Sequence, residues 1–175
     1  MKIQLSDIAQ FVAYRVSSSK ILLQEYVTTD SILPDKQGRT MAQNMPPQTC
    51  SLTKFEKGDV LVSNIRPYLR KIWLADMAGG ASADVLVFRA KKNSSSQYLY
   101  AVLAQDVFYD WVMLGTKGSR MPRGNREQIM RFPILELCEQ ETLHIGTLIE
   151  NISNKINLNR QINQNLCARR VQAVA

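Results

Sequence analysis

FEKGDVLVSNIRPYLRKIWLA, from Phe55 to Ala75, is the stretch of sequence that decides the fold. Apolar and polar residues alternate on both sides of Pro67, and this period of two predicts at least two β-strands. Because proline cannot donate a hydrogen bond to a neighbouring strand, Pro67 is expected at a turn or an edge. The bend carries one aromatic and three basic side chains, Tyr68, Arg66, Arg70 and Lys71. The stretch therefore predicts a hairpin with a basic tip.

Around this hairpin the pattern predicts a mixture of helices and strands. Ser6 and Asp7 resemble the N-cap of a short helix, and residues 32–48, with three prolines, predict a long polar loop. Gly79 and Gly80 predict a turn, which is followed by a strand over residues 84–89. A capping box, Ser94 with Gln97, predicts one helix that ends at Gly115.

Positive charge is concentrated in the middle of the chain. The sequence holds 22 Lys and Arg against 15 Asp and Glu, a net charge of +7, and 13 of those cations but only 7 of the anions lie between Lys54 and Arg131. A basic patch of this kind suits a polyanion such as nucleic acid. The same charges could equally be solvated surface residues.

Residues 115–126 predict an exposed loop, because they hold three glycines, a proline and four basic side chains. Arginine can bind guanine through two donors or hold a phosphate. The candidate DNA-binding residues lie on this loop, at the hairpin tip and in the polar loop: Arg70, Lys71, Lys117, Ser119, Arg120, Arg123, Asn125, Arg126, Arg39 and Asn44. Alternatively, the basic residues of the hairpin brace it by pairing with Asp59 or Asp76.

The last segment, from Glu139 to about Arg170, predicts one long helix of about 45 to 50 Å. Apolar residues recur along it at spacings near three and four, with an asparagine interrupting them: Ile145, Ile149, Ile152, Ile156, Asn159, Ile162 and Leu166. Folding back onto its own domain would account for the first turns of this stripe. The remainder is expected to pair with a partner helix, which divides the chain into a globular domain, 1–138, and an interaction helix, 139–175.

Motifs for catalysis are weak or missing in the sequence. Residues 44–48, NMPPQ, resemble the base-gripping motif of amino-methyltransferases, but Met45 separates the asparagine from the prolines, and Gln48 stands where an aromatic ring should stack. His144 is the sole histidine, and neither a glycine-rich cofactor loop nor a nucleophile elbow is present. We therefore expect a chain that is not an enzyme.

Metal, disulfide and membrane signals are also missing. The three cysteines are scattered, which fits neither a zinc site nor a disulfide framework. No apolar run approaches the roughly 18 residues of a membrane span, so we expect a cytoplasmic protein without a metal site.

The hairpin belongs to a series of segments that together resemble a known family. These segments are, in order, Tyr26–Asp30, Ile32–Pro34, the NIRPY bend, Ala83–Phe88, Gly115–Gly124, Phe132–Ile134 and Lys155–Arg160. Their order and content resemble the target recognition domain and spacer helix of the specificity subunit of type I restriction-modification systems. The resemblance covers nearly the whole chain.

The resemblance implies an α+β fold, in which a mixed α/β target recognition domain is followed by a long C-terminal coiled-coil helix. Family members carry two such domains and two antiparallel helices, whereas this chain has one of each. It is then either a half-subunit that forms a homodimer through the helix, or a fragment of a longer chain.

The resemblance also implies partners. The chain would read half of a bipartite site on double-stranded DNA and dock a modification (methyltransferase) subunit and an ATP-dependent restriction subunit. S-adenosylmethionine, ATP and magnesium would be bound by those subunits and not by this chain. Two alternative hypotheses for the function are a stand-alone dimeric DNA-binding regulator and a structural coiled-coil interaction protein.

Overall fold

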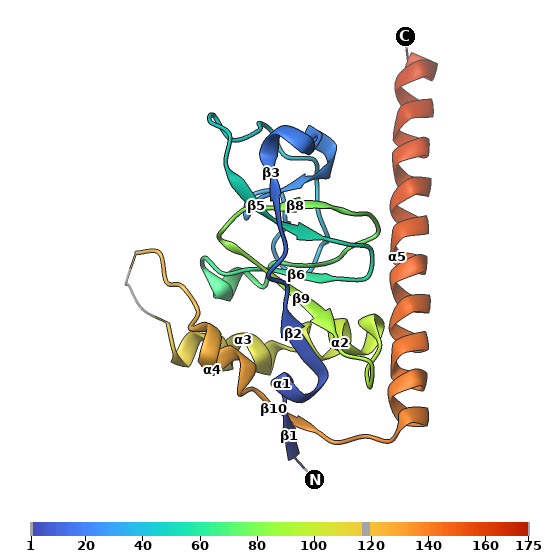
Figure 1. The fold of residues 1–175 in the computed structure, drawn as a ribbon. Helices are drawn as coiled ribbons and strands as arrows, with labels where there is room; N and C mark the ends of the chain where they lie inside the picture. Colours follow the sequence, from blue (N-terminus) through green and yellow to red (C-terminus); the bar gives the residue numbers. More distant parts are fainter. Residues whose placement is uncertain (1, 117–119, 175) are drawn as a thin grey trace.

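The computed structural model describes residues 2–116 and 120–174 of the chain. Within these residues, helices and strands are mixed in a globular part, and the long helix α5 (Glu139–Val174) lies alongside it (Figure 1). This arrangement confirms the predicted α+β class with a long C-terminal helix.

The first sheet is antiparallel and contains the predicted hairpin. Its strands follow the order β2 (Ala9–Phe11), β9 (Val85–Ala90), β6 (Val60–Ser63) and β7 (Ile72–Leu74). β6 and β7 flank the bend and pair with Val60 opposite Leu74. The bend itself is a 3-10 turn, η3 (Pro67–Leu69). The predicted strands and the predicted turn at the proline are therefore confirmed.

The second sheet packs on one face of the first. Its order is β3 (Arg15–Ser17), β5 (Ser51–Phe55), β8 (Gly79–Ala81) and β4 (Tyr26–Val27), with β4 parallel to β8. Two short 3-10 turns, η1 (Ser18–Lys20) and η2 (Leu23–Glu25), connect β3 to β4. The core between the sheets includes Phe55, Leu61, Trp73 and Val87, and the rings of Phe55 and Trp73 meet edge to face.

The turn predicted at Gly79–Gly80 is wrong, because both glycines lie in β8. A Cβ atom at Gly79 would overlap the backbone carbonyl oxygen of Glu25 and press on the ring of Phe55. The missing side chain lets the η2 turn approach the strand closely. Glycine serves close packing here, and not a change of chain direction.

The other face of the first sheet is covered by helices α2 (Ser96–Leu103), α3 (Asp106–Leu114) and α4 (Arg126–Met130). Their buried side chains, among them Leu99, Phe108, Tyr109 and Ile129, form one core with Val62 and Phe88 of the sheet. One helix was predicted where α2 and α3 stand. The chain instead breaks at Ala104–Gln105, and Ser95, not Ser94, caps α2 by accepting a hydrogen bond from the Tyr98 amide. Gly115 follows α3 as predicted.

The beginning of the chain pairs with the segment that precedes the long helix. β1 (Lys2–Gln4) and β10 (Pro133–Leu135) form a two-stranded antiparallel sheet. The short helix α1 (Leu5–Ile8) follows, with Gln4 as its N-cap, so the cap predicted at Ser6–Asp7 is wrong. Asp7 still acts at this end of the helix, because its carboxylate accepts the Gln4 amide at 2.8 Å.

Helix α5 is anchored to the globular part by its first turns. Gly146 is buried against α2, where a Cβ atom would lie 3.2 Å from the Ser95 hydroxyl, and Ile145 packs on the helical core. With 36 residues the helix is about 54 Å long. Figure 1 shows it extending past both sheets.

Candidate nucleic-acid interface

Three segments that are distant in sequence meet on one surface. The Asp35 and Lys36 amides donate to the carbonyls of Leu69 and Arg70 at 2.9 and 3.1 Å, which joins the polar loop to the hairpin bend. The Arg66 amide donates to the Pro122 carbonyl at 3.0 Å, which joins the bend to the α3–α4 connection. We call the surface of these segments the basic face, after its cations: Lys36, Arg66, Arg70, Arg120 and Arg123.

The basic face lies away from the long helix. The α3–α4 connection projects from the side of the globular part opposite α5 (Figure 1). Arg66, Arg120 and Arg123 are exposed there, and Tyr68 and Met121 expose 51% and 46% of their surface beside them. Exposed cations beside an aromatic ring suit contacts with phosphates and bases.

The backbone of the basic face is unusual. Asp35, Lys36, Arg66 and Arg70 have positive φ angles between 49° and 61°, and no other non-glycine residue of the described chain does. Such left-handed conformations are uncommon for residues other than glycine, and they persist only where the surroundings fix them. The backbone hydrogen bonds between the three segments supply that constraint. Composition does not predict this feature, since none of the four is a glycine and only Asp35 is of a type that adopts this conformation more often.

Asp106 connects two of the three segments. It stands at the first position of α3 and accepts a hydrogen bond from Lys36 Nζ at 2.6 Å, with Arg70 Nη1 at 3.5 Å from the same oxygen. The hydrogen bond from Lys36 and the two positive charges hold the pKa of Asp106 below its usual value. Sequence reasoning missed this carboxylate, because its partners lie 70 and 36 positions earlier in the chain.

Asp84 pairs with Arg123 in a similar way. Arg123 Nε lies 3.1 Å and Nη2 3.5 Å from the two carboxylate oxygens, and the Asp84 carbonyl accepts the Asn64 amide at 2.8 Å. Isolated bridge contacts between Ile65 and Arg123 hold the same region. Arg123 is thus positioned by the hairpin bend and by the residue that precedes β9.

Other predicted DNA-binding residues have internal contacts. Arg39 lies over the Trp73 ring at 4.6 Å and donates to the Gln24 carbonyl, and burial lowers the pKa of its guanidinium. Lys71 Nζ donates to the Thr29 carbonyl at 2.7 Å. These contacts favour a bracing role for Arg39 and Lys71. Asn44 is exposed on the polar loop.

The predicted residues at the end of the α3–α4 connection have structural contacts too. The Asn125 side chain caps α4 by accepting the amides of Glu127 and Gln128, and Arg126 lies 5.5 Å from the centre of the Phe11 ring. α4 itself was not predicted. Lys117 and Ser119 lie outside the described residues.

The alternative pairing of the hairpin cations with Asp59 is wrong. Asp59 is buried, and its carboxylate accepts two hydrogen bonds from Arg89, both at 2.8 Å. Arg70 pairs with Asp106 instead. The sequence could not rank these partners, because Arg89 meets Asp59 only when β6 and β9 pair.

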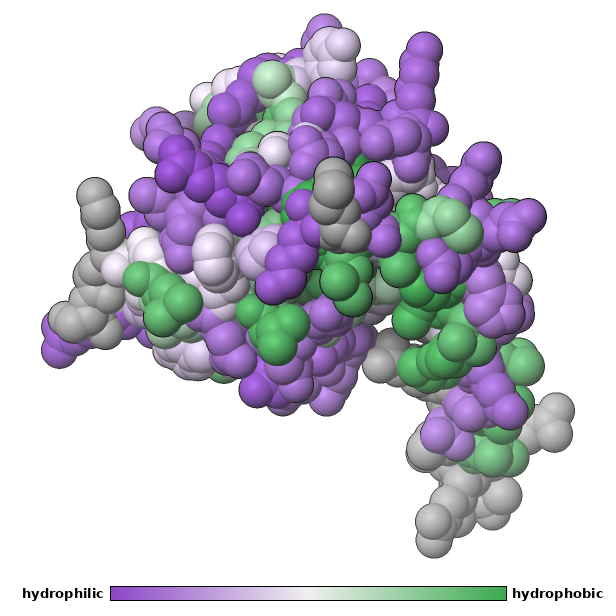
Figure 2. All heavy atoms as spheres, turned by 90° about the horizontal axis from the view of Figure 1, so that it is seen from below, coloured by the Kyte–Doolittle hydropathy of each residue, from purple (hydrophilic) through white to green (hydrophobic). Residues whose placement is uncertain are grey.

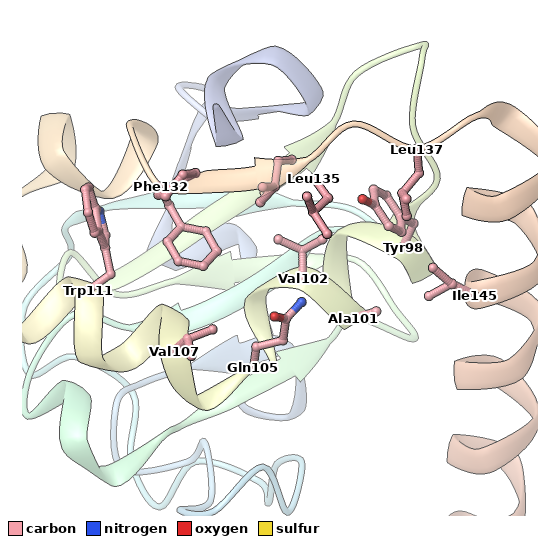
Figure 3. A pocket seen from close by; sticks show the side chains of 12 residues that line it. Tyr98, Ala101, Val102, Gln105, Val107, Trp111, Phe132, Leu135, Leu137 and Ile145 are labelled. Atoms are coloured by element: carbon pink, nitrogen blue, oxygen red, sulfur yellow. The ribbon is translucent and has the colours of Figure 1, made fainter. Parts of the chain in front are cut away.

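An apolar hollow lies elsewhere on the described part of the chain. It has a volume of about 450 Å³ and lies between α2, α3, β10 and the start of α5 (Figure 3). Its lining is mainly apolar and includes Val102, Trp111, Phe132 and Leu137. On this underside of the molecule, apolar side chains reach from the globular part to α5 (Figure 2).

The predicted interface residues of α5 differ in exposure. Ile145 and Ile149 are half-buried, whereas Ile152, Ile156, Ile162 and Leu166 expose 45% to 58% of their surface and Asn159 is exposed as well. In this single chain the apolar stripe is therefore covered only at its start. Among the described residues, no helix is both long and apolar enough to cross a bilayer, and no group of three candidate ligands could hold a metal ion.

Two of the three comparisons with known proteins find similarity to type I specificity subunits. No protein-family model matches the sequence. Over 132 residues, the chain is 23% identical to the type I restriction enzyme EcoDI specificity subunit of Escherichia coli, an alignment that covers 69% of this chain and 29% of that protein.

The fold is similar to that of solved specificity subunits. The HsdS subunit from Thermoanaerobacter tengcongensis matches with a TM-score of 0.67 at 17% identity, over 95% of this chain and 45% of the other. A chain from a structure of the type I R-M system matches with a TM-score of 0.61 at 13% identity, over 95% of this chain and 41% of the other. The S subunit from M. genitalium matches with a TM-score of 0.58 at 12% identity, over 94% of this chain and 44% of the other. The resemblance seen in the sequence is thus confirmed, and the chain spans less than half the length of these relatives.

Proposed function

We propose that this chain, which resembles half of a type I specificity subunit in sequence and fold, binds double-stranded DNA and recognises part of its sequence. The observation that carries the proposal is the basic face. Three segments place Lys36, Arg70, Arg120 and Arg123 on one surface opposite α5, joined by backbone hydrogen bonds. Exposed cations on a fixed backbone are suited to hold phosphates and to read base edges.

The long helix would join two copies of the chain. Its uncovered stripe, Ile152 to Leu166, is expected to bury itself against the same stripe of a second copy, with Asn159 fixing the register. An antiparallel, two-fold pair would place the two globular parts at opposite ends of a rod. Such a dimer would bind an interrupted palindrome with half-sites on the order of one helical turn apart.

The chain would select the site and leave the chemistry to other proteins. A modification subunit carrying S-adenosylmethionine and a restriction subunit using ATP and magnesium would dock on the dimer. The similarity to specificity subunits and to a chain of the type I R-M system supports this assignment. An adjacent methyltransferase gene would support it further.

Replacing Arg120 or Arg123 with alanine tests the basic face. Each change is expected to weaken DNA binding, by about 1 to 3 kcal/mol where the arginine reads a base, and to reduce the salt slope by about 1 where it holds a phosphate. The measurement is binding to a duplex that carries the cognate site, titrated at several salt concentrations.

Lys20 supplies the control for this experiment, since it is an exposed cation on the distant η1 turn. Lys20→Ala removes the same charge and is expected to leave affinity and slope nearly unchanged. If both arginine variants keep the affinity and slope of the wild type, the basic face is not the DNA-binding surface.

A further inference from the structure

Asp84 and Asp106 form ion pairs with cations of the basic face, where DNA phosphates would have to approach. The single negative charge of Asp106 is shared by Lys36 and Arg70, and Asp84 pairs with Arg123. We propose that Asp84 and Asp106 are specificity determinants, which weaken the binding of this face to DNA of non-cognate sequence. The inference rests on the proposed function and adds the residues that oppose indiscriminate binding.

The exposure of these ion pairs shows that they are accessible to a ligand. The side chain of Asp106 is 54% exposed, and those of Lys36 and Arg70 are 31% and 42% exposed. Asp84 and Arg123 expose 41% and 53%. An ion pair open to solvent contributes little to folding. In contrast, Asp59 is buried against Arg89 and serves the fold.

The competition between carboxylate and phosphate has a definite direction. Non-specific binding depends on cations that neutralise phosphates and release counterions. Lys36, Arg70 and Arg123 must leave or share their carboxylates to do this, and each carboxylate left behind repels the phosphate. Binding to every non-cognate sequence is weakened by the lost ion pairs and by this repulsion.

A cognate site can offset the same cost. Cytosine and adenine present amino groups in the major groove, and a carboxylate accepts hydrogen bonds from such donors. A base with an amino group opposite Asp84 or Asp106 would therefore donate a hydrogen bond to the carboxylate, while the cations move to the DNA phosphates.

Asp106→Asn and Asp84→Asn test the inference with a short duplex of mixed sequence as the probe. Each variant is expected to bind this duplex about threefold to tenfold more tightly than the wild type at physiological salt. The plot of log affinity against log salt should also become steeper, by about 0.9 for each cation that is freed. A merely structural carboxylate would not steepen this slope.

Asp110→Asn is the matched control. Asp110 is exposed one turn further along α3, and it forms none of the ion pairs found among the described residues. The variant loses the same charge on the same helix and should stay within about twofold of the wild type. Asp106→Glu keeps the charge and should also bind as the wild type does, which separates charge from any local loss of structure.

The outcomes are distinguishable. If the wild type binds the duplex but Asp106→Asn and Asp84→Asn bind no more tightly than Asp110→Asn, the two carboxylates do not weaken non-cognate binding and the inference is wrong. If no form of the chain binds any duplex even at low salt, the proposed function itself fails, and this inference fails with it.

Discussion

Replacing Ile152 and Ile156 together with glutamate is expected to leave the chain monomeric in solution. The two side chains are 47% and 45% exposed in the single chain and lie four residues apart on α5. Burying an isoleucine fully contributes about 1.5 to 3 kcal/mol, and a two-fold pair would bury four of them. Charged glutamates at the same positions would have to be desolvated without partners, so the pair should dissociate.

Sedimentation equilibrium at micromolar concentration would measure this change. The wild type should show about twice the chain mass of 19.9 kDa, and the double variant should show the mass of one chain. Leu143→Glu is the matched control, because Leu143 is 65% exposed on the same helix but lies on the opposite side from Ile152. A wild type that is monomeric at these concentrations would contradict the proposed dimer.

Asp59→Ala is expected to have the largest effect on folding, lowering the free energy of unfolding by about 2 to 4 kcal/mol. The buried carboxylate accepts two hydrogen bonds from Arg89 and one from the Glu56 amide, each at 2.8 Å. The hydrogen bond to Asp59 raises the pKa of Arg89, and a guanidinium is always charged in proteins. Alanine would leave this guanidinium and the amide without their partner, although the partial exposure of Arg89 lets water recover part of the loss.

Urea unfolding would measure the effect as a lower midpoint with an unchanged slope. Glu56→Gln is the comparison, since Glu56 contacts the same guanidinium at 3.0 Å from an exposed position. That change should cost less than about 1 kcal/mol. Equal losses in the two variants would mean that burial of Asp59 does not matter.

Much of the fold follows from local patterns. The alternation from Phe55 to Ala75 predicts β6 and β7, and Pro67 marks their turn, because both signals depend on neighbours in sequence. α5 is predicted for the same reason. The errors occur where contacts between residues distant in sequence decide the structure. A glycine stands in the strand at position 79 because the Glu25 carbonyl leaves no space for a side chain there.

The candidate site divides in the same way. Glycine, proline and arginine in the α3–α4 connection predict an exposed basic loop, and the structure places Arg120 and Arg123 on it. Their acidic neighbours could not be predicted, since Asp84 meets Arg123 across 39 positions and Asp106 meets Lys36 across 70. A contact that depends on tertiary folding leaves no periodic or local signal.

The pairing of β1 with β10 brings the first strand next to the residues that lead into α5. In an antiparallel pair of helices, the far end of the partner's α5 would fall near this same place. In the proposed dimer, this small sheet would thus support the start of one long helix and stand beside the end of the other.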